Sequence, residues 1–71
     1  MKDKQQAIGG LIKSRRKSLK VRQEHLADLA GVSIRTLRNI EKGDSNPELD
    51  TLLKVCYVLG MEIRIQVILP R

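Results

Sequence analysis

The chain has 71 residues, and 14 Lys and Arg against 8 Asp and Glu give it a formal net charge of +6. This length fits one domain, the charge favours a polyanionic partner, and a single cysteine excludes an internal disulfide. The only aromatic residue, Tyr57, argues against binding RNA or single strands through stacked bases, and the only histidine, His25, leaves no Cys/His zinc cluster, so we expect neither metal nor cofactor.

The N-terminal residues 1–6 are polar, and we expect this segment to be flexible. The start MKDKQQAIGG lacks the long apolar core of a signal peptide, and no later run approaches the about 20 apolar residues of a membrane span. We therefore expect a cytoplasmic protein with no membrane partner. Because so short a domain is marginally stable alone, we also expect association with another chain.

A first helix is predicted from about Gln6 to Ser18. Its expected core stripe consists of Ile8, Leu11, Ile12 and Leu19. The pair Gly9-Gly10 weakens this helix by up to ~1 kcal/mol for each glycine relative to alanine. Residues 19–22 then connect it to the next helix.

Residues 23–43, QEHLADLAGVSIRTLRNIEKG, indicate two short helices joined by a tight turn. An apolar stripe at helical spacing marks the first of them: Leu26, Ala27, Leu29 and Ala30. Gly31 is expected to end it, because glycine adopts the left-handed conformation at little steric cost. Ser33 is a favourable N-cap for the second helix, in which Leu37 and Ile40 face the core and which Gly43 ends.

The remaining face of this second helix is polar and basic. It carries Arg35, Thr36, Arg38, Asn39 and Lys42. Arginine pairs in a fork with guanine, asparagine pairs with adenine, and threonine reaches several base edges, so such a face suits the major groove of DNA. Two short helices of this kind are typical of the helix-turn-helix, whose second helix reads DNA.

Residues 44–47 form a loop of turn-forming types, and a last helix is predicted with Asn46 as its cap and Pro47 as its first residue. Its wide apolar face consists of Leu49, Leu52, Leu53, Cys56 and Leu59, and Gly60 is expected to end it. Cys56 has two interpretations, a small buried hydrophobic residue or a reactive thiol.

The C-terminal segment 61–71 alternates apolar and polar residues with period two, which predicts a β-strand that Pro70 ends. Its apolar face consists of Met61, Ile63, Ile65, Val67 and Leu69. The sequence contains no second strand pattern, so the simplest interpretation is antiparallel pairing with the same strand of a second copy in a homodimer. The alternatives are a strand docked on its own domain and a disordered tail.

The pattern as a whole resembles a known family. The carrying residues are Gln23-x-x-Leu26-Ala27-x-x-Ala30-Gly31-Val32-Ser33, then x-x-x-Leu37-x-x-x-Glu41-x-Gly43, with Ile8-Gly9-x-x-Ile12-Lys13-x-x-Arg16 before and Pro47-x-x-x-Thr51-Leu52 after. Residues 7–60 thereby resemble the Cro/C1-type (Xre-family) helix-turn-helix of phage repressors and small bacterial regulators. The resemblance implies a mainly α, lambda-repressor-like bundle of four to five helices, to which this chain adds the single C-terminal strand.

The resemblance also implies roles for single residues. The base-reading positions of the family correspond to Ile34, Arg35, Thr36 and Asn39, and the phosphate-contacting positions to Arg16, Gln23, Ser33, Arg38 and Lys42. Arg16 is also expected to pair with Glu41, although it could be plain surface charge. Arg22 stands where the family has a capping Thr, which costs on the order of 1 kcal/mol, and it is expected to reach a phosphate instead.

Two of these positions keep alternatives. Gln23 is either a phosphate ligand or a polar residue of a first helical turn. Ile34 cannot hydrogen-bond, so it either touches a thymine methyl group or packs on the neighbouring turn.

A helix-turn-helix domain followed by one dimerising strand resembles the HipB-type antitoxins, which repress their own operon and hold a HipA-like kinase toxin. The first functional hypothesis is therefore a homodimeric repressor of a palindromic operator that is also an antitoxin. The second is a stand-alone repressor of a phage or mobile element. The third, a small enzyme, is disfavoured because the sequence shows no phosphate-binding loop and no acidic pair in a plausible cleft.

Overall fold

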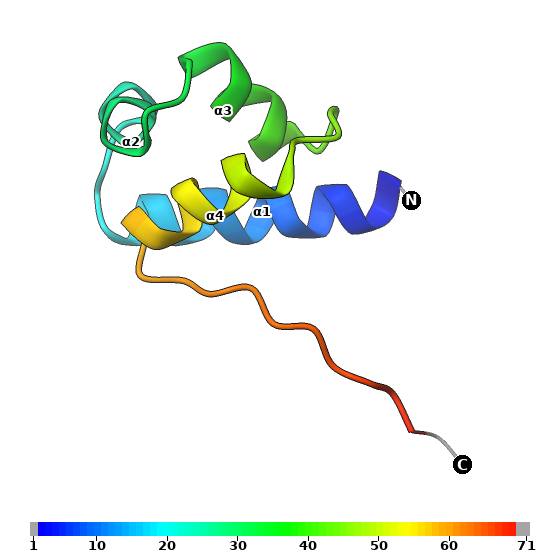
Figure 1. Cartoon of the computed structure of the whole chain (residues 1–71). Coiled ribbons are helices and arrows are strands. Elements are labelled where there is room, and N and C mark those ends of the chain that lie inside the picture. The colour runs from blue at the N-terminus through cyan, green and yellow to red at the C-terminus, as the bar shows by residue number, and fades with distance from the viewer. Residues whose placement is uncertain (1, 70–71) are drawn as a thin grey trace.

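The computed structural model describes residues 2–69 and is built of helices packed around one core (Figure 1). Within that range the helices are α1 (Lys2–Ser18), α2 (Gln23–Ala30), α3 (Ile34–Lys42) and α4 (Leu49–Val58). Helix α3 packs across α1, and α2 contacts both α3 and α4. This arrangement confirms the predicted mainly helical, lambda-repressor-like bundle. None of the helices between residues 2 and 69 has the length and apolar character needed to cross a membrane.

Glycines end the two central helices, as predicted. Gly31 and Gly43 have φ of 71° and 76°, a left-handed conformation that side chains with a Cβ rarely adopt. The residue after each glycine closes the helix, and the Val32 N–H donates to the Ala27 carbonyl at 3.0 Å. The turn between α2 and α3 is therefore set by local chemistry that is visible in the sequence.

Two predicted helix starts are wrong. Helix α1 begins at Lys2 rather than Gln6, so residues 2–6 are helical, and α4 begins at Leu49 with Glu48 as its N-cap. Asn46 does not cap α4, because its side-chain oxygen accepts a hydrogen bond from the amide of Gln5. The Asn46 side chain therefore contacts α1 instead of the start of α4. Met1, Pro70 and Arg71, which belong to the predicted terminal segments, lie outside the described residues.

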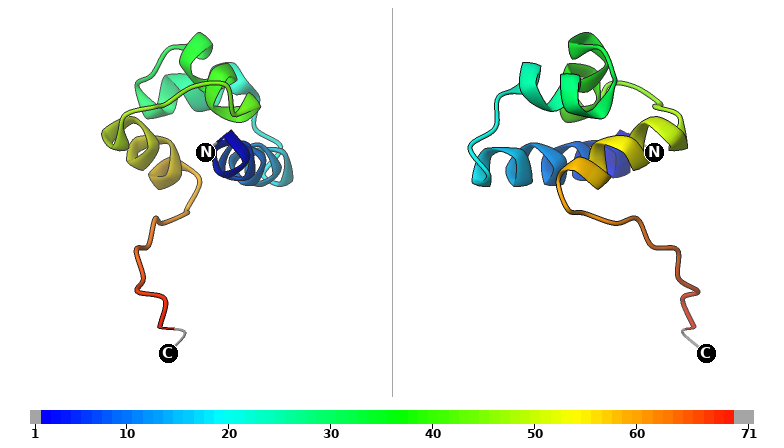
Figure 2. Two further views of the ribbon diagram at one scale, coloured as in Figure 1. Left: turned by 90° about the vertical axis from the view of Figure 1, so that its right-hand side faces the viewer. Right: turned by 60° about the vertical axis from the view of Figure 1, so that its left-hand side comes forward.

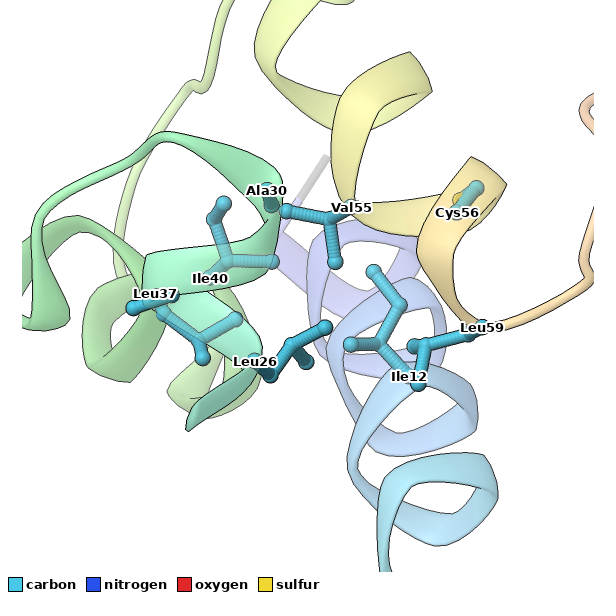
Figure 3. Close-up of a cluster of buried hydrophobic side chains, with 9 residues drawn as sticks. Ile12, Leu26, Ala30, Leu37, Ile40, Val55, Cys56 and Leu59 are labelled. Atoms are coloured by element: carbon cyan, nitrogen blue, oxygen red, sulfur yellow. The ribbon is translucent and has the colours of Figure 1, made fainter. Parts of the chain in front are cut away.

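The core draws on all four helices (Figure 3). Its buried apolar side chains are Ile12, Leu26, Ala27, Ala30, Leu37, Ile40, Val55, Cys56 and Leu59. The core stripe predicted for the first helix is mostly wrong, because Ile12 alone of its four residues is buried and Leu11 is 63% exposed. The inward face of α1 instead carries Gly9, Ile12 and Arg16, so a glycine and a charged residue occupy positions that hydrophobicity would not select.

The C-terminal segment leaves the helical domain and extends away from it (Figure 2). Residues 61–69 form no strand, because no other stretch of the described chain runs beside them. The apolar face expected to be buried is exposed beyond Met61, and Ile65 reaches 95% exposure. In the single chain, the predicted strand is therefore an extended segment without a pairing partner.

Close packing of α1 on α3 generates a prediction from the Gly9-Gly10 pair. A Cβ at Gly9 would lie 2.2 Å from the carbonyl oxygen of Ile40, whereas a Cβ at Gly10 would meet no atom within 4 Å. Gly9→Ala should therefore force the helices apart and cost at least about 2 kcal/mol of unfolding free energy. The matched control Gly10→Ala should gain up to about 1 kcal/mol from helix propensity. Urea denaturation followed by circular dichroism measures both, and equal effects would contradict the packing.

Candidate nucleic-acid interface

Helix α3 begins with the cap that its sequence predicts. Ser33 has φ −73° and ψ 153°, and its Oγ accepts a hydrogen bond from the Thr36 N–H at 3.0 Å. The Ser33 hydroxyl also donates to Thr36 Oγ1 at 2.8 Å. Because the Ser33 proton is used inside the helix, Thr36 is the better placed of the two hydroxyls to donate to a ligand.

The two faces of α3 differ sharply in character. Leu37, Ile40 and Glu41 are buried against the domain. The other face carries exposed Arg35, Arg38 and Lys42, with Thr36 and Asn39 half-buried beside them. The structure therefore brings these five predicted contact residues together on one helix face, which carries three cations and no carboxylate.

Ile34 does not share this outward position. It is partly buried and packs against the hydrophobic core at the start of α3. Of its two interpretations, packing on the neighbouring turn is the one that this placement supports. The contact of Ile34 with a thymine methyl group, which the resemblance implies, stays a prediction.

The position of α3 is fixed by a buried ion pair. Arg16 Nε donates to Glu41 Oε2 at 2.7 Å, and a second guanidinium nitrogen donates to Oε1 at 3.0 Å. The remaining terminal nitrogen donates to the Val21 carbonyl at 2.9 Å. Arg16 and Glu41 are only 8% and 7% exposed. The predicted pair is therefore present, while the phosphate contact of Arg16 stays a prediction.

Gln23 joins the same network from α2. Its side-chain N–H donates to Glu41 Oε1 at 2.9 Å, so the carboxylate links the first three helices. This hydrogen bond was not predicted, and spacing alone could not reveal it because it joins residues 18 positions apart. One of the two side-chain N–H groups of Gln23 is thus engaged, and its backbone N–H at the start of α2 is a further donor suited to a phosphate.

The charges of the pair stabilise each other. Burial alone would raise the pKa of the Glu41 carboxyl, but hydrogen bonds from Arg16 and Gln23 and the charges of Arg16 and Lys13 outweigh it, so this pKa is lowered. The hydrogen bond to Glu41 raises the pKa of Arg16 against the opposing effect of burial. Both groups therefore remain ionised at neutral pH.

Arg22 and Arg15 complete the basic surroundings. Arg22 occupies the N-cap of α2, is exposed, and makes no side-chain capping bond, so the loss of the family's capping hydroxyl is confirmed. Arg15 was not predicted to have a role, yet its Nε donates to the Leu59 carbonyl at 2.9 Å and ties α1 to the end of α4. No sequence signal marks this contact, because its partner is a backbone atom.

Cys56 belongs to the core rather than to a reactive site. It is buried, and burial raises the pKa of its thiol, which disfavours the nucleophilic thiolate. Of its two interpretations, the small buried hydrophobic residue is the one that the structure supports.

A glycine-ended helix, a serine-capped turn and a second helix with a basic outer face together define a helix-turn-helix. The helix-turn-helix family matches residues 12–66 of the chain. The chain therefore belongs to this family, which confirms the family resemblance seen in the sequence.

Two relatives have similar sequences. The chain is 44% identical over 50 residues to an HTH-type transcriptional regulator of Haemophilus influenzae, a match over 70% of this chain and 51% of that protein. It is 36% identical over 58 residues to the HTH-type transcriptional regulator y4mF of Sinorhizobium fredii, a match over 82% of this chain and 76% of that protein. The chain thus spans about half the length of the Haemophilus relative.

A solved structure has the same fold. The clp gene regulator ClgR from Corynebacterium glutamicum superposes with a TM-score of 0.76 at 30% sequence identity. The match covers 80% of this chain and 61% of ClgR.

The buried pair generates a stability prediction. Glu41→Gln leaves the Arg16 charge buried without its counterion, which should cost about 3 kcal/mol at neutral pH. Because the pKa of Glu41 is lowered on folding, the wild-type advantage is complete above the ordinary glutamate pKa of about 4.3 and is lost as pH falls below it. Urea denaturation of both proteins, at neutral pH and at about pH 3, should show the difference shrinking on acidification.

The exposed pair of Asp50 and Lys54 provides the control, with 3.2 Å between its charged atoms. Asp50→Asn should cost less than about 1 kcal/mol, because water screens this pair. A Glu41→Gln cost as small as that of Asp50→Asn would show that the buried pair does not hold α3 in place.

Proposed function

We propose that this chain binds double-stranded DNA in a sequence-specific manner and represses transcription as a homodimer. The observation that carries the proposal is the outer face of α3, where Arg35, Thr36 and Asn39 lie beside further cations and no carboxylate. The names of both sequence relatives and of ClgR as regulators support it. The proposal places the protein with DNA in the cytoplasm and assigns it no catalytic activity.

In this proposal two sets of residues have different tasks, one set reading bases and the other contacting phosphates. Arg35, Thr36 and Asn39 read base edges in the major groove, where forked contacts to guanine and adenine give discrimination. The phosphate contacts come from Arg22, Arg38, Lys42 and the N-terminus of α2 at Gln23, whereas the Ser33 hydroxyl, whose proton is used within α3, serves as the helix cap. They position the domain and release counterions, so affinity falls steeply with salt.

The homodimer of the proposal forms through the C-terminal segment. Apolar side chains alternate along residues 61–69 and are exposed beyond Met61, and an unpaired strand of this kind is an association site. A two-fold axis through paired segments presents two α3 helices to half-sites about 34 Å apart, which requires a palindromic operator.

We extend the proposal to an antitoxin role, in which the dimer also holds a HipA-like kinase toxin. The support is the order of a helix-turn-helix domain and a dimerising segment. The alternative is a stand-alone phage or mobile-element repressor with no toxin. The neighbouring gene separates the two, because only the antitoxin role requires a kinase-like toxin gene beside this one.

Base reading is tested with paired arginine variants on an operator selected from random duplexes. Arg35→Ala should cost about 1–3 kcal/mol of binding free energy on the operator and relax the preference at one base pair. Arg22→Ala should weaken operator and random DNA alike and flatten the salt slope. Fluorescence anisotropy titrations measure both. Equal losses on operator and random DNA for Arg35→Ala would remove this residue from base reading.

The dimer is tested by sedimentation velocity. Ile65→Glu places a charge on the apolar face of the C-terminal segment and should give monomers. The control Gln66→Glu changes the neighbouring polar face and should leave the dimer intact. A dimer that persists in the Ile65→Glu protein at micromolar concentration would show that this segment is not the interface.

A further inference from the structure

We propose a specific register for the homodimer, in which two C-terminal segments pair antiparallel about a two-fold axis that passes through Ile65. Met61 of one copy then lies opposite Leu69 of the other, and Ile63 lies opposite Val67. This inference rests on the homodimer proposed above and deepens it by assigning the interface residue by residue. A second copy of this chain is the sole partner that it requires.

The alternation of the segment sets the first constraint. The apolar residues of 61–69 fall on odd positions, with Ile68 as the exception on the polar face. Side chains on a strand alternate between faces, so a slip of one residue would place every apolar side chain opposite a polar one. Only registers that pair odd positions with odd positions keep one apolar face, and in all of these the axis passes through a residue rather than between two.

The registers that remain differ in whether like charges face each other and in how many apolar residues are paired. An axis at Arg64 places two guanidinium groups directly opposite each other, which is destabilising. An axis at Ile63 leaves Val67 and Leu69 unpaired, and an axis at Val67 leaves Met61 and Ile63 unpaired. An axis at Gln66 leaves Met61 unpaired. The axis at Ile65 pairs the whole described segment, and it sets Arg64 opposite the neutral Gln66.

The surface where the segment leaves α4 supports the same register. Leu53, Tyr57, Met61 and Ile63 line an open groove of about 510 Å³ there. Its apolar walls are accessible in the single chain, since Tyr57 is 85% exposed and Leu53 is 45% exposed. With the axis at Ile65, the partner's Leu69 and Val67 arrive beside Met61 and Ile63, at the mouth of this groove.

Strand pairing therefore brings the exposed apolar residues of one copy to the apolar groove of the other. Exposure along the apolar face rises from 40% at Ile63 to 95% at Ile65 and stays at 82% at Leu69, so the far half of each segment has no cover in its own chain. In the antiparallel pair, the end of each segment lies beside the start of its partner's segment, next to the partner's helical domain. Val67 and Leu69 thus gain burial without any added segment.

Cysteine crosslinking tests the register on full-length protein. With Cys56→Ala as background, Ile65→Cys should give a covalent dimer as the main species on mild oxidation, because facing Cα atoms of paired strands lie about 4.5–5.5 Å apart. Ile63→Cys and Val67→Cys alone should each lose this species, since their own copies lie about 13 Å away along the strand. An equimolar mixture of the two should regain it.

Each outcome decides the question. Crosslinking confined to Ile65→Cys and to the Ile63→Cys with Val67→Cys mixture supports the register. A dimer in sedimentation whose Ile63→Cys or Val67→Cys variant crosslinks to itself as strongly as Ile65→Cys overturns the register while leaving the homodimer intact. Single-cysteine variants of a dimeric Cys56→Ala background that crosslink equally at every position overturn it as well. A wild-type chain that sediments as a monomer overturns the homodimer itself.

Discussion

The arrangement of this domain depends on one buried ion pair, in which the Arg16 guanidinium grips the Glu41 carboxylate with two hydrogen bonds. Taking two charges out of water costs several kcal/mol for each ion, so a hydrophobic pair would serve stability as well. We infer that the main effect of the pair is to fix the relative orientation of the helices. The planar fork fixes α3 across α1, and the additional hydrogen bond from Gln23 fixes α2 to the same carboxylate.

This anchoring determines which residues remain available for a ligand. Helix α3 turns Leu37, Ile40 and Glu41 inward, so Arg35, Arg38 and Lys42 must face solvent. Gly9 strengthens the constraint, because it lets α1 approach the backbone of α3 more closely than any side chain would allow. Helix α3 is thus held both by close backbone contact at Gly9 and by the ion pair of Arg16 with Glu41. Two such contacts suit a helix that must present its polar face rigidly.

Local rules and distant contacts explain which predictions succeeded. The ends of the central helices follow from Gly31, Ser33 and Gly43, whose chemistry acts within a few residues, and these predictions are confirmed. The cap of α4 was wrong because the Asn46 side chain contacts Gln5, 41 positions away, which no local pattern shows. The inward face of α1 was misjudged because hydrophobicity does not show which side of a helix a neighbour will cover. The C-terminal alternation predicts a strand, yet a strand needs a partner that a single chain does not contain.

The most direct test of the account is to map the DNA-binding surface by NMR. Backbone amide signals of the isotope-labelled chain are followed while an operator duplex is added. The account predicts that the shifting signals gather at the start of α2, the turn and α3, around Gln23, Ser33 and Arg35. Shifts confined to α4 and the C-terminal segment, with α3 unchanged, would contradict it.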